Sequence, residues 1–241
     1  MAVRLEDRAV KLIGLGGIGT PVGQALAQFL SSRRLRAQLW LIDGDSYEER
    51  NRDRVLFQTP TNKAMERALE WSAACLGLPG VIPVPQYLTP RNAGRLIGER
   101  DIVFLCVDNH ATRKAVSNRC ARLRDVVLIS GGNDGIEDGR AGTFGNVQIY
   151  IRQDGRSVTS PLTRFHPEIA RPRDRRPDQQ GCLALAASAP QLLFTNLAVA
   201  AAMLGAFYRW LCGDPSYEEV FLDIREARMQ PVRRAALTGR A

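Results

Sequence analysis

A glycine-rich turn near the N-terminus is the strongest candidate for chemistry in this sequence of 241 residues. Gly14, Gly16, Gly17 and Gly19 come directly after a short apolar run and before a helical pattern. Glycines let the backbone turn tightly and approach a phosphate, and a helix N-terminus offers free N–H groups and partial positive charge. Asp43 ends the next apolar run, where a carboxylate can accept hydrogen bonds from ribose hydroxyls. These residues predict a nucleotide site, and from them alone NAD, FAD, SAM and ATP all remain candidates.

Further polar residues follow the two apolar runs that bear on this site. Asp45, Asn51, Arg54 and Lys63 come after the run that ends at Asp43. Two of them have a plainer interpretation: Lys63 as a solvated helix residue and Arg54 as a surface ion-pair partner.

Asp108 and Asn109 follow the apolar run 102–107 in the same way. In α/β sheets ligands bind beyond the carboxyl ends of the strands, so we expect this pair to reach the same nucleotide. The alternative for Asp108 is that it only caps the helix that follows.

The elements that must position these residues alternate between strand and helix patterns. Apolar runs at 9–13, 37–42, 81–84, 102–107 and 126–130 predict strands, and 18–30, 63–76 and 112–123 predict helices. This order indicates an α/β fold with a doubly wound, mostly parallel sheet. The pattern then changes: 144–151 and 219–224 resemble half-exposed strands and predict an antiparallel C-terminal extension, with an apolar helix within 183–211. We expect one domain over 1–241, with a long mobile or crossover loop at 152–181 and a basic tail at 232–241.

The order and spacing of the polar motifs resemble those of the ThiF/MoeB family, the adenylating domain shared with ubiquitin-activating enzymes. The family pattern is a Gly-x-Gly-Gly-x-Gly turn, Asp-x-Asp, Asn-x-x-Arg, a Lys on the next helix, and a strand that ends in Asp-Asn. Cys182, eight residues before Pro190 and a long apolar helix, is a further match. The resemblance covers about residues 11–204 and implies a Rossmann-like fold.

The resemblance also implies a reaction. Members of the family use MgATP to convert the C-terminal carboxylate of a small ubiquitin-like or sulfur-carrier protein into an acyl adenylate. By resemblance, Asp43 holds the ribose and the glycine turn faces the nucleotide, with Asp45, Asn51 and Asn109 lining its site. Arg54 and Lys63 neutralise the departing pyrophosphate, and Asp108 holds Mg²⁺.

Cys182 is implied as an acceptor of the activated acyl group, since a thiolate is a competent nucleophile. The other four cysteines look like core residues: Cys75, Cys106, Cys120 and Cys212. The sequence contains no Cys-x-x-Cys pair, so we expect no zinc. Neither histidine supports a His-based triad: we expect His110 to cap or line the helix after Asp108, and His166, in the long loop, has no evident partner.

Composition limits the remaining classes of function. The net charge of +8 favours an anionic partner, and no apolar run is long and uninterrupted enough to cross a membrane. The five cysteines are widely spaced and odd in number, which argues against a disulfide framework and predicts the reducing cytoplasm. The family resemblance implies the partner: a small ubiquitin-like or sulfur-carrier protein with a Gly-Gly-like C-terminus. We expect a homodimer or a heteromeric complex, because the arginine that many members supply to the neighbouring ATP site lies in a helix that this sequence lacks.

Three alternatives remain open at this point. The chain could be a catalytically inactive nucleotide-binding scaffold or partner subunit. It could be an NAD-dependent oxidoreductase, although no histidine or tyrosine is expected beside the cofactor to act as its acid. Nucleic-acid binding is a weak alternative, since the arginines are not interleaved with aromatic residues.

Overall fold

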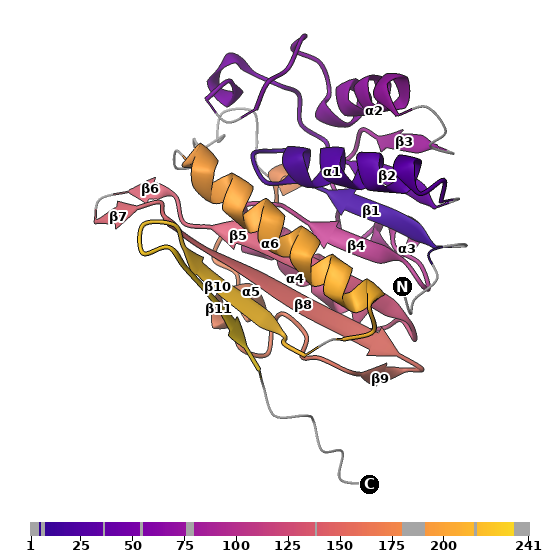
Figure 1. Ribbon diagram of the computed structural model, residues 1–241, viewed down its shortest axis with the longest axis vertical. Helices are drawn as coiled ribbons and strands as arrows, with labels where there is room; N and C mark the ends of the chain where they lie inside the picture. Colours follow the sequence, from indigo (N-terminus) through magenta and orange to yellow (C-terminus); the bar gives the residue numbers. More distant parts are fainter. Residues whose placement is uncertain are drawn as a thin grey trace, which may run out of the picture.

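One continuous sheet forms the centre of the protein, in a computed structural model that describes residues 5, 8–35, 37–53, 55–75, 80–137, 139–179, 191–214 and 216–233 (Figure 1). The strands, in chain order, are β1 (Ala9–Ile13), β2 (Gln38–Ile42), β3 (Val81–Val84), β4 (Ile102–Leu105), β5 (Val126–Asn133), β6 (Ile136–Glu137), β7 (Arg140–Ala141), β8 (Phe144–Gln153), β9 (Arg156–Ser157), β10 (Glu219–Asp223) and β11 (Arg228–Val232). The helices are α1 (Gly19–Ser32), the short 3₁₀ helix η1 (Glu49–Asn51), α2 (Lys63–Ala74), α3 (Ala93–Leu96), α4 (His110–Cys120), α5 (Pro167–Ala170), η2 (Pro177–Gln179) and α6 (Leu193–Leu211).

The strand order is β11-β10-β8-β5-β4-β1-β2-β3, with β9 paired to β8 and β6 to β7. The five strands from β3 to β5 are parallel, and β8, β10 and β11 continue the sheet in antiparallel fashion. The predicted fold class is therefore confirmed. The chain leaves β1 toward one side of the sheet and β4 toward the other, so the order reverses between these two neighbours.

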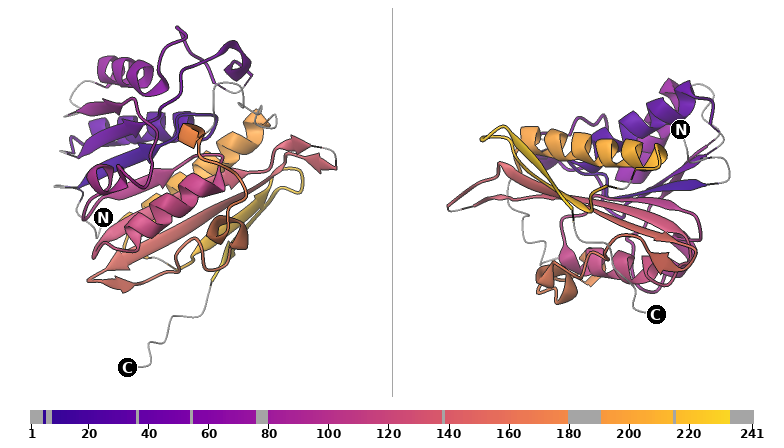
Figure 2. Two further views of the ribbon diagram at one scale, coloured as in Figure 1. Left: turned by 180° about the vertical axis from the view of Figure 1, so that it is seen from behind. Right: turned by 60° about the horizontal axis from the view of Figure 1, so that its bottom comes forward.

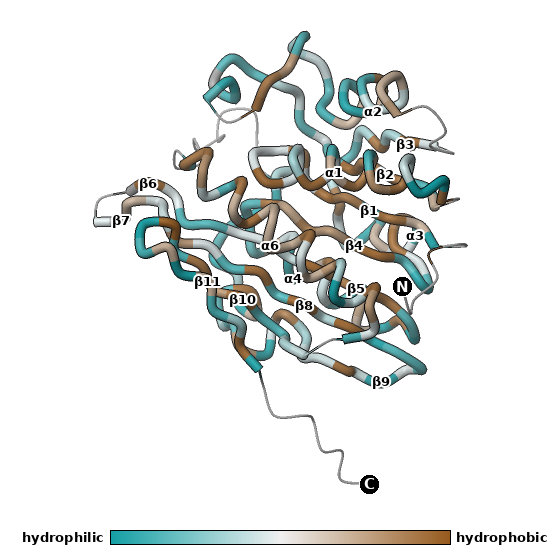
Figure 3. Tube along the Cα trace, in the orientation of Figure 1, coloured by the Kyte–Doolittle hydropathy of each residue, from teal (hydrophilic) through white to brown (hydrophobic). Residues whose placement is uncertain are grey.

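Helices cover both faces of the sheet. Apolar residues of α1, α2 and α6 pack on one face, and those of α3, α4 and α5 pack on the other. Figure 2 shows these layers from behind and from below, and Figure 3 shows hydrophobic residues along the central strands. Continuous apolar strands such as β4, all four of whose residues are buried, are typical of a parallel sheet covered on both sides.

Several predicted boundaries need correction. Helix α4 begins at His110 rather than at residue 112, and β5 continues to Asn133 instead of ending at 130. Strand β11 occupies residues that were not predicted to form a strand. Helix α6 begins at Leu193, and the earlier part of the predicted 183–211 helix lies largely outside the described residues.

The segment 152–181, predicted as a loop, includes the end of β8, β9, α5 and η2. It crosses the back of the molecule near the N-terminal end of α4 (Figure 2). The Asp174 carboxylate accepts hydrogen bonds there from the backbone N–H groups of His110 and Ala111, at 2.6 and 3.0 Å. This contact caps α4 and fixes the segment to it.

Candidate active site

A cavity of about 790 Å³ opens at the carboxyl ends of β1 and β4, where the strand order reverses. Gly14 lines it at the end of β1, and Cys106 and Val107 line it at the end of β4. Ligands of open α/β sheets bind at such a reversal, because the loops that leave the two strands diverge and leave a crevice between them.

The glycine turn forms one wall of this cavity, and its glycines have different roles. Gly14 has φ of +90°, and a Cβ there would lie 2.8 Å from the carbonyl oxygen of Cys106. A Cβ on Gly19 would lie 1.8 Å from the carbonyl oxygen of Gly14, so Gly19 closes the turn and does not line the cavity. Gly16 and Gly17 do line it, and a Cβ on Gly16 would meet no described atom beyond its chain neighbours within 4 Å. Gly16 therefore leaves room for a ligand.

Asp43, at the end of β2, connects the glycine turn to the next loop. Its carboxylate accepts hydrogen bonds from the N–H of Leu15 at 2.6 Å and from the N–H of Asp45 at 2.8 Å. Burial raises the pKa of Asp43 to about 6, although the positive charge of Lys63 acts in the opposite direction. The carboxylate lines the cavity, where its remaining lone pairs can accept hydrogen bonds from a ligand.

Lys63 and Asp45 form an ion pair beside Asp43, with Nζ and Oδ2 3.2 Å apart. Burial opposes the charge of Lys63, but the carboxylates of Asp43 and Asp45 outweigh this effect and raise its pKa. The other oxygen of Asp45 accepts a hydrogen bond from the hydroxyl of Tyr87. All four side chains line the cavity, so the structure brings three of the predicted residues together and adds Tyr87.

The first turn of α2 places Lys63. Asn62 precedes it as the N-cap, and its side-chain oxygen accepts hydrogen bonds from the N–H groups of Ala64 and Met65, at 3.0 and 3.2 Å. The amide of Asn62 donates to the carbonyl oxygens of Asp43 and Asp45. One side chain therefore caps the helix and fixes it to the loop that follows β2.

Asn51 lies apart from the cavity. Its side-chain oxygen accepts a hydrogen bond from the N–H of Glu48 at 3.0 Å in a capping box around η1, and the residue is buried. Its carbonyl oxygen accepts from the N–H of Val55. Arg54, predicted to neutralise pyrophosphate, lies outside the described residues.

Asp108 lines the cavity as an exposed carboxylate in the loop between β4 and α4. The N-cap of α4 is Asn109, whose side chain accepts a hydrogen bond from the N–H of Thr112 at 2.8 Å. The alternative in which Asp108 serves as the helix cap is therefore wrong, and its carboxylate is left for other partners.

Arg113, one turn into α4, anchors the loop between β4 and α4. Its guanidinium donates to the carbonyl oxygens of Val107 and Gly131 and to the hydroxyl of Ser130, at 2.7–2.8 Å. The side chain is buried, and burial lowers its pKa. Arg113 thus ties the β4–α4 loop that carries Asp108 to β5.

Two further residues that can carry protons line the cavity, Tyr87 and His110, although the sequence analysis expected no histidine or tyrosine acid beside an NAD cofactor. Burial raises the pKa of Tyr87 above its usual value, and burial lowers that of His110.

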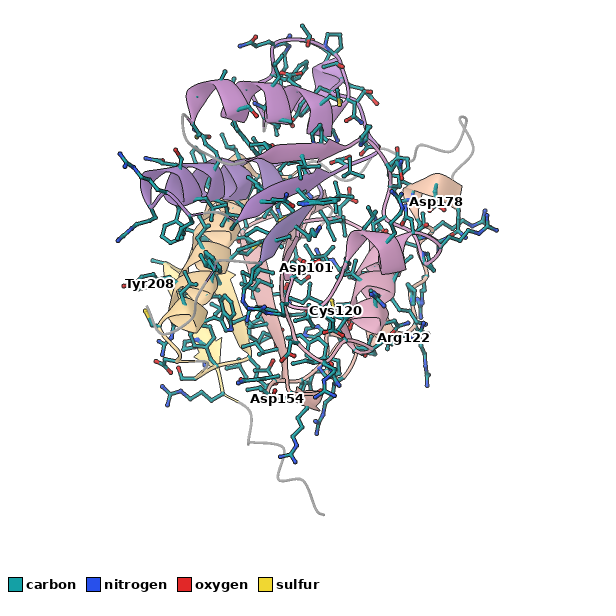
Figure 4. The ribbon with its side chains drawn as sticks, turned by 90° about the vertical axis from the view of Figure 1, so that its right-hand side faces the viewer. Asp101, Cys120, Arg122, Asp154, Asp178 and Tyr208 are labelled. Atoms are coloured by element: carbon teal, nitrogen blue, oxygen red, sulfur yellow. The ribbon has the colours of Figure 1, made fainter. Side chains whose placement is uncertain are left out.

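The cysteines in the described part of the chain differ in how deeply they are buried. Burial raises the pKa of Cys106 and that of Cys120 to about 12, which confirms both as core residues, and Figure 4 labels Cys120 at the end of α4. Cys75 is half-buried, whereas Cys212 is exposed at the end of α6, so its prediction as a core residue is wrong. Cys182 lies outside the described residues.

A histidine–carboxylate cluster was missed by the sequence analysis. The two ring nitrogens of His166 lie 2.8 Å from an oxygen of Glu168 and 2.7 Å from an oxygen of Glu219, and Glu219 is only 2% exposed. The prediction that His166 has no partner is wrong. His166 and Glu219 are far apart in sequence, and no local motif joins them.

With this geometry established, comparison with known proteins identifies the family. The model of the ThiF family matches residues 2–240. The chain belongs to the ThiF family. Two relatives are the adenylyltransferase and sulfurtransferase MOCS3 of Drosophila ananassae, 33% identical over 132 residues, and its counterpart uba4 of Aspergillus clavatus, 30% identical over 124 residues. These matches cover 54% and 50% of this chain but only 28% and 24% of the relatives, so the chain spans about a quarter of their length.

Solved structures of similar fold agree with the architecture of this chain. Escherichia coli MccB, solved with ATP, aligns with a TM-score of 0.68 at 16% identity, over 95% of this chain and 64% of that one. PaaA aligns with a TM-score of 0.62 at 20% identity, over 95% and 65%. At these identities the likeness concerns the fold.

Two kinds of feature are absent from the described part of this ThiF-family chain. No helix there combines the length and apolar character that a membrane crossing requires. The same residues contain no group of three or more His, Cys, Asp or Glu side chains arranged to hold a metal ion.

Proposed function

We propose that this chain is an ATP-dependent adenylyltransferase that activates the C-terminal carboxylate of a ubiquitin-like or sulfur-carrier protein as an acyl adenylate. One observation carries the proposal: the glycine turn, Asp43, the Asp45–Lys63 pair and Asp108 of a ThiF-family chain all line a single cavity at the strand-order reversal. Names of relatives support it, since MOCS3 and uba4 are called adenylyltransferases and MccB has been solved with ATP.

In this proposal a carboxylate oxygen of the substrate attacks the α-phosphorus of ATP. The new bond gives the acyl adenylate, and the bond to the bridging oxygen breaks so that pyrophosphate leaves with the electron pair. No proton needs to move, because the attacking group is already a carboxylate. Catalysis then depends on positioning and on stabilising the negative charge that develops on the leaving group.

The cavity residues divide these tasks. Asp43 accepts hydrogen bonds from the ribose, and the open face at Gly16 and Gly17 lets the phosphates approach the backbone. Lys63 exchanges its partner Asp45 for the departing pyrophosphate. Because Lys63 is mostly buried and held by α2, it loses little conformational freedom in this exchange.

Three further residues have supporting roles in the proposal. Asn109 is the N-cap of α4 and lines the cavity beside Asp108, and Asn51 holds the turn that precedes Arg54. Arg54 supplies a second cation to the pyrophosphate, as the family motif implies. Its substitution by alanine should abolish adenylate formation and leave the protein folded.

Mg²⁺ fits the donor set at Asp108. This cation keeps several water ligands and binds through one or two carboxylates plus substrate phosphates, and Asp108 is an exposed carboxylate whose neighbour Asn109 provides the helix cap in its place. When bound, Mg²⁺ neutralises phosphate charge. In this proposal the carboxylate of Asp108 holds Mg²⁺ together with the phosphates of ATP.

Cys182 is proposed as the acceptor in a second step. Its thiolate attacks the acyl carbonyl carbon of the adenylate, a thioester forms, and AMP leaves. Cys182→Ala should then leave pyrophosphate release intact and remove only the covalent conjugate. Loss of pyrophosphate release in a folded Cys182→Ala protein would contradict this order of steps.

We also propose that the chain works in the cytoplasm as a homodimer or within a heteromeric complex. Exposed apolar side chains on α6 support an association, among them Phe194, Leu197 and Tyr208, the last of which points away from the sheet in Figure 4. Light scattering of the active protein should give at least twice the mass of one chain, and a fully active monomer would contradict the proposal.

Exchange of labelled pyrophosphate into ATP tests the adenylation step. A synthetic peptide or carrier protein with a Gly-Gly tail should support exchange by the wild type, and Asp108→Ala should lower the rate at least 100-fold without a change in melting temperature. A protein that binds MgATP but never exchanges pyrophosphate would instead favour the inactive scaffold.

A further inference from the structure

The cavity extends well beyond the part that fits a nucleotide. Past Arg113 and Gly132 it runs over the ends of β5, β8 and β10 and beneath α5. We call this part the distal half of the cavity. Its lining includes Asp134, Phe144, Gln148, His166, Glu168 and Phe221. It is continuous with the nucleotide part, so a chain whose end reaches the α-phosphate would lie along it.

The floor of the distal half contains a buried hydrogen-bond acceptor with no donor. Gln148, on β8, is 5% exposed, and its Oε1 has no hydrogen-bond partner among the described residues. A buried amide oxygen without a hydrogen bond costs about 1–3 kcal/mol of stability. A ligand that donates an N–H group to this oxygen supplies the missing hydrogen bond and therefore binds more tightly. The ligand expected here is therefore a donor.

The walls of the distal half are acidic. Asp134 and Glu168 line it, and Glu219 lies behind His166. Against these three carboxylates stand His166, even when it is protonated, and the buried guanidinium of Arg113 at the border with the nucleotide part, so a net negative charge remains. None of the described lining residues of this half is lysine or arginine, although the whole chain has a net charge of +8. The acidity is thus local to the groove, where it favours a cation.

Two aromatic rings complete the groove. Phe144 on β8 and Phe221 on β10 stack with their centroids 6.0 Å apart, and Phe144 is 40% exposed. An exposed ring face beside carboxylates attracts a planar cation more strongly than a compact one. Arginine has five N–H donors, no acceptor and a flat guanidinium, which matches a groove that offers acceptors and a ring.

We propose that the distal half selects an arginine side chain in the C-terminal tail of the protein substrate, a few residues before the carboxylate that is activated. The inference rests on the proposed function, because it assumes that the tail enters along this cavity. Asp134 and Glu168 pair with the guanidinium, Gln148 accepts an N–H from the tail, and Phe144 packs on the flat side chain.

Matched peptides test the inference. Seven-residue peptides that end in Gly-Gly carry one arginine at the third, fourth or fifth position from the C-terminus, or citrulline, its uncharged counterpart, at the same position. Binding is measured by calorimetry with an ATP analogue that cannot be cleaved between the α- and β-phosphates, and turnover is measured by pyrophosphate exchange. For at least one position the arginine peptide should bind at least 10-fold more tightly, which corresponds to about 1.4 kcal/mol.

Variants locate the selectivity. The quantity compared is the affinity for the arginine peptide divided by the affinity for the citrulline peptide. Asp134→Asn combined with Glu168→Gln should bring this ratio close to one, whereas Asp154→Asn should keep the wild-type ratio. Asp154 is the matched control, since it is an exposed carboxylate at the β8–β9 turn, at the other end of β8 from Phe144 (Figure 4).

The outcomes separate the inference from the proposed function. Wild-type ratios below 2 at all three positions, an unchanged ratio in the double variant, or no binding of any peptide at 1 mM would each overturn the inference. Equal exchange with arginine and citrulline peptides overturns it while it supports adenylation. Failure to bind the ATP analogue, with no exchange from any peptide, would instead overturn the proposed function. The wild-type ratio needs no variant, so misfolding of the double variant leaves the test intact.

Discussion

Substituting two glycines of the same turn should separate ligand binding from stability. In Gly19→Ala the new Cβ would lie 1.8 Å from the carbonyl oxygen of Gly14, about 1.5 Å closer than a carbon–oxygen contact allows. The backbone must move, at a cost of about 3 kcal/mol. For a chain of this size that lowers the melting temperature by about 6–12 °C.

Gly16→Ala should behave in the opposite way. No described atom beyond the chain neighbours lies within 4 Å of its Cβ, and Gly16 does not have a positive φ. The free energy of unfolding should stay the same or rise by up to about 1 kcal/mol, because alanine restricts the unfolded chain. The methyl group points into space that the phosphates need, so the dissociation constant for MgATP should rise at least 10-fold.

Differential scanning fluorimetry with and without MgATP measures both effects. At 100 times the wild-type dissociation constant, ligand stabilises the wild type by about 2.7 kcal/mol, and a 10-fold weaker Gly16→Ala protein by only about 1.4 kcal/mol. Gly205→Ala on α6 is a control glycine with equally open surroundings. A Gly16→Ala protein that responds to MgATP as the wild type does, or that melts as low as Gly19→Ala, would refute this assignment of the turn.

Three further substitutions test other parts of the structure. Burial raises the pKa of Asp43 to about 6 in the folded protein, so its contribution to stability is present below pH 4 and is lost as the pH rises through 6. Between pH 4 and 6.5 the wild type should therefore lose about 2 kcal/mol more than Asp43→Asn in urea titrations, and parallel curves would contradict this. His166→Ala leaves the buried carboxylate of Glu219 without its ring partner and should lower the free energy of unfolding by about 2–3 kcal/mol, so a loss below 0.5 kcal/mol would count against the cluster. Cys212→Ser should remove one thiol that reacts rapidly with Ellman's reagent, whereas Cys106→Ala should remove none; the reverse pattern would contradict their burial.

The site residues that the sequence predicts correctly are those that follow the carboxyl ends of parallel strands. Val81–Val84 forms β3 with the predicted bounds, and Asp43, Lys63 and Asp108 share one cavity because parallel strands bring their carboxyl ends to the same edge. These relations follow from local patterns plus one rule of topology, so periodicity and spacing are enough to find them.

Contacts between distant segments could not be predicted in this way. Asp174 caps α4 from a segment more than 60 residues away, and His166 meets Glu219 across 53 residues. Both contacts depend on how the 152–181 segment crosses the sheet, and hydrophobic periodicity carries no information on that path. Asn51 matches a family motif, yet among the described residues it lies outside the cavity lining and accepts a hydrogen bond from Glu48 in the capping box of η1, a contact that spacing alone does not reveal.

The response of the melting temperature to MgATP and to NAD tests the central claim most directly, because it needs no protein partner. At about 100 times the dissociation constant, MgATP should stabilise the wild type by about 2.7 kcal/mol, and Lys63→Ala should lose much of that gain, while NAD should have no effect. Stabilisation by NAD and not by MgATP, or an equal response of Lys63→Ala and the wild type to MgATP, would contradict the assignment of this cavity to adenylation.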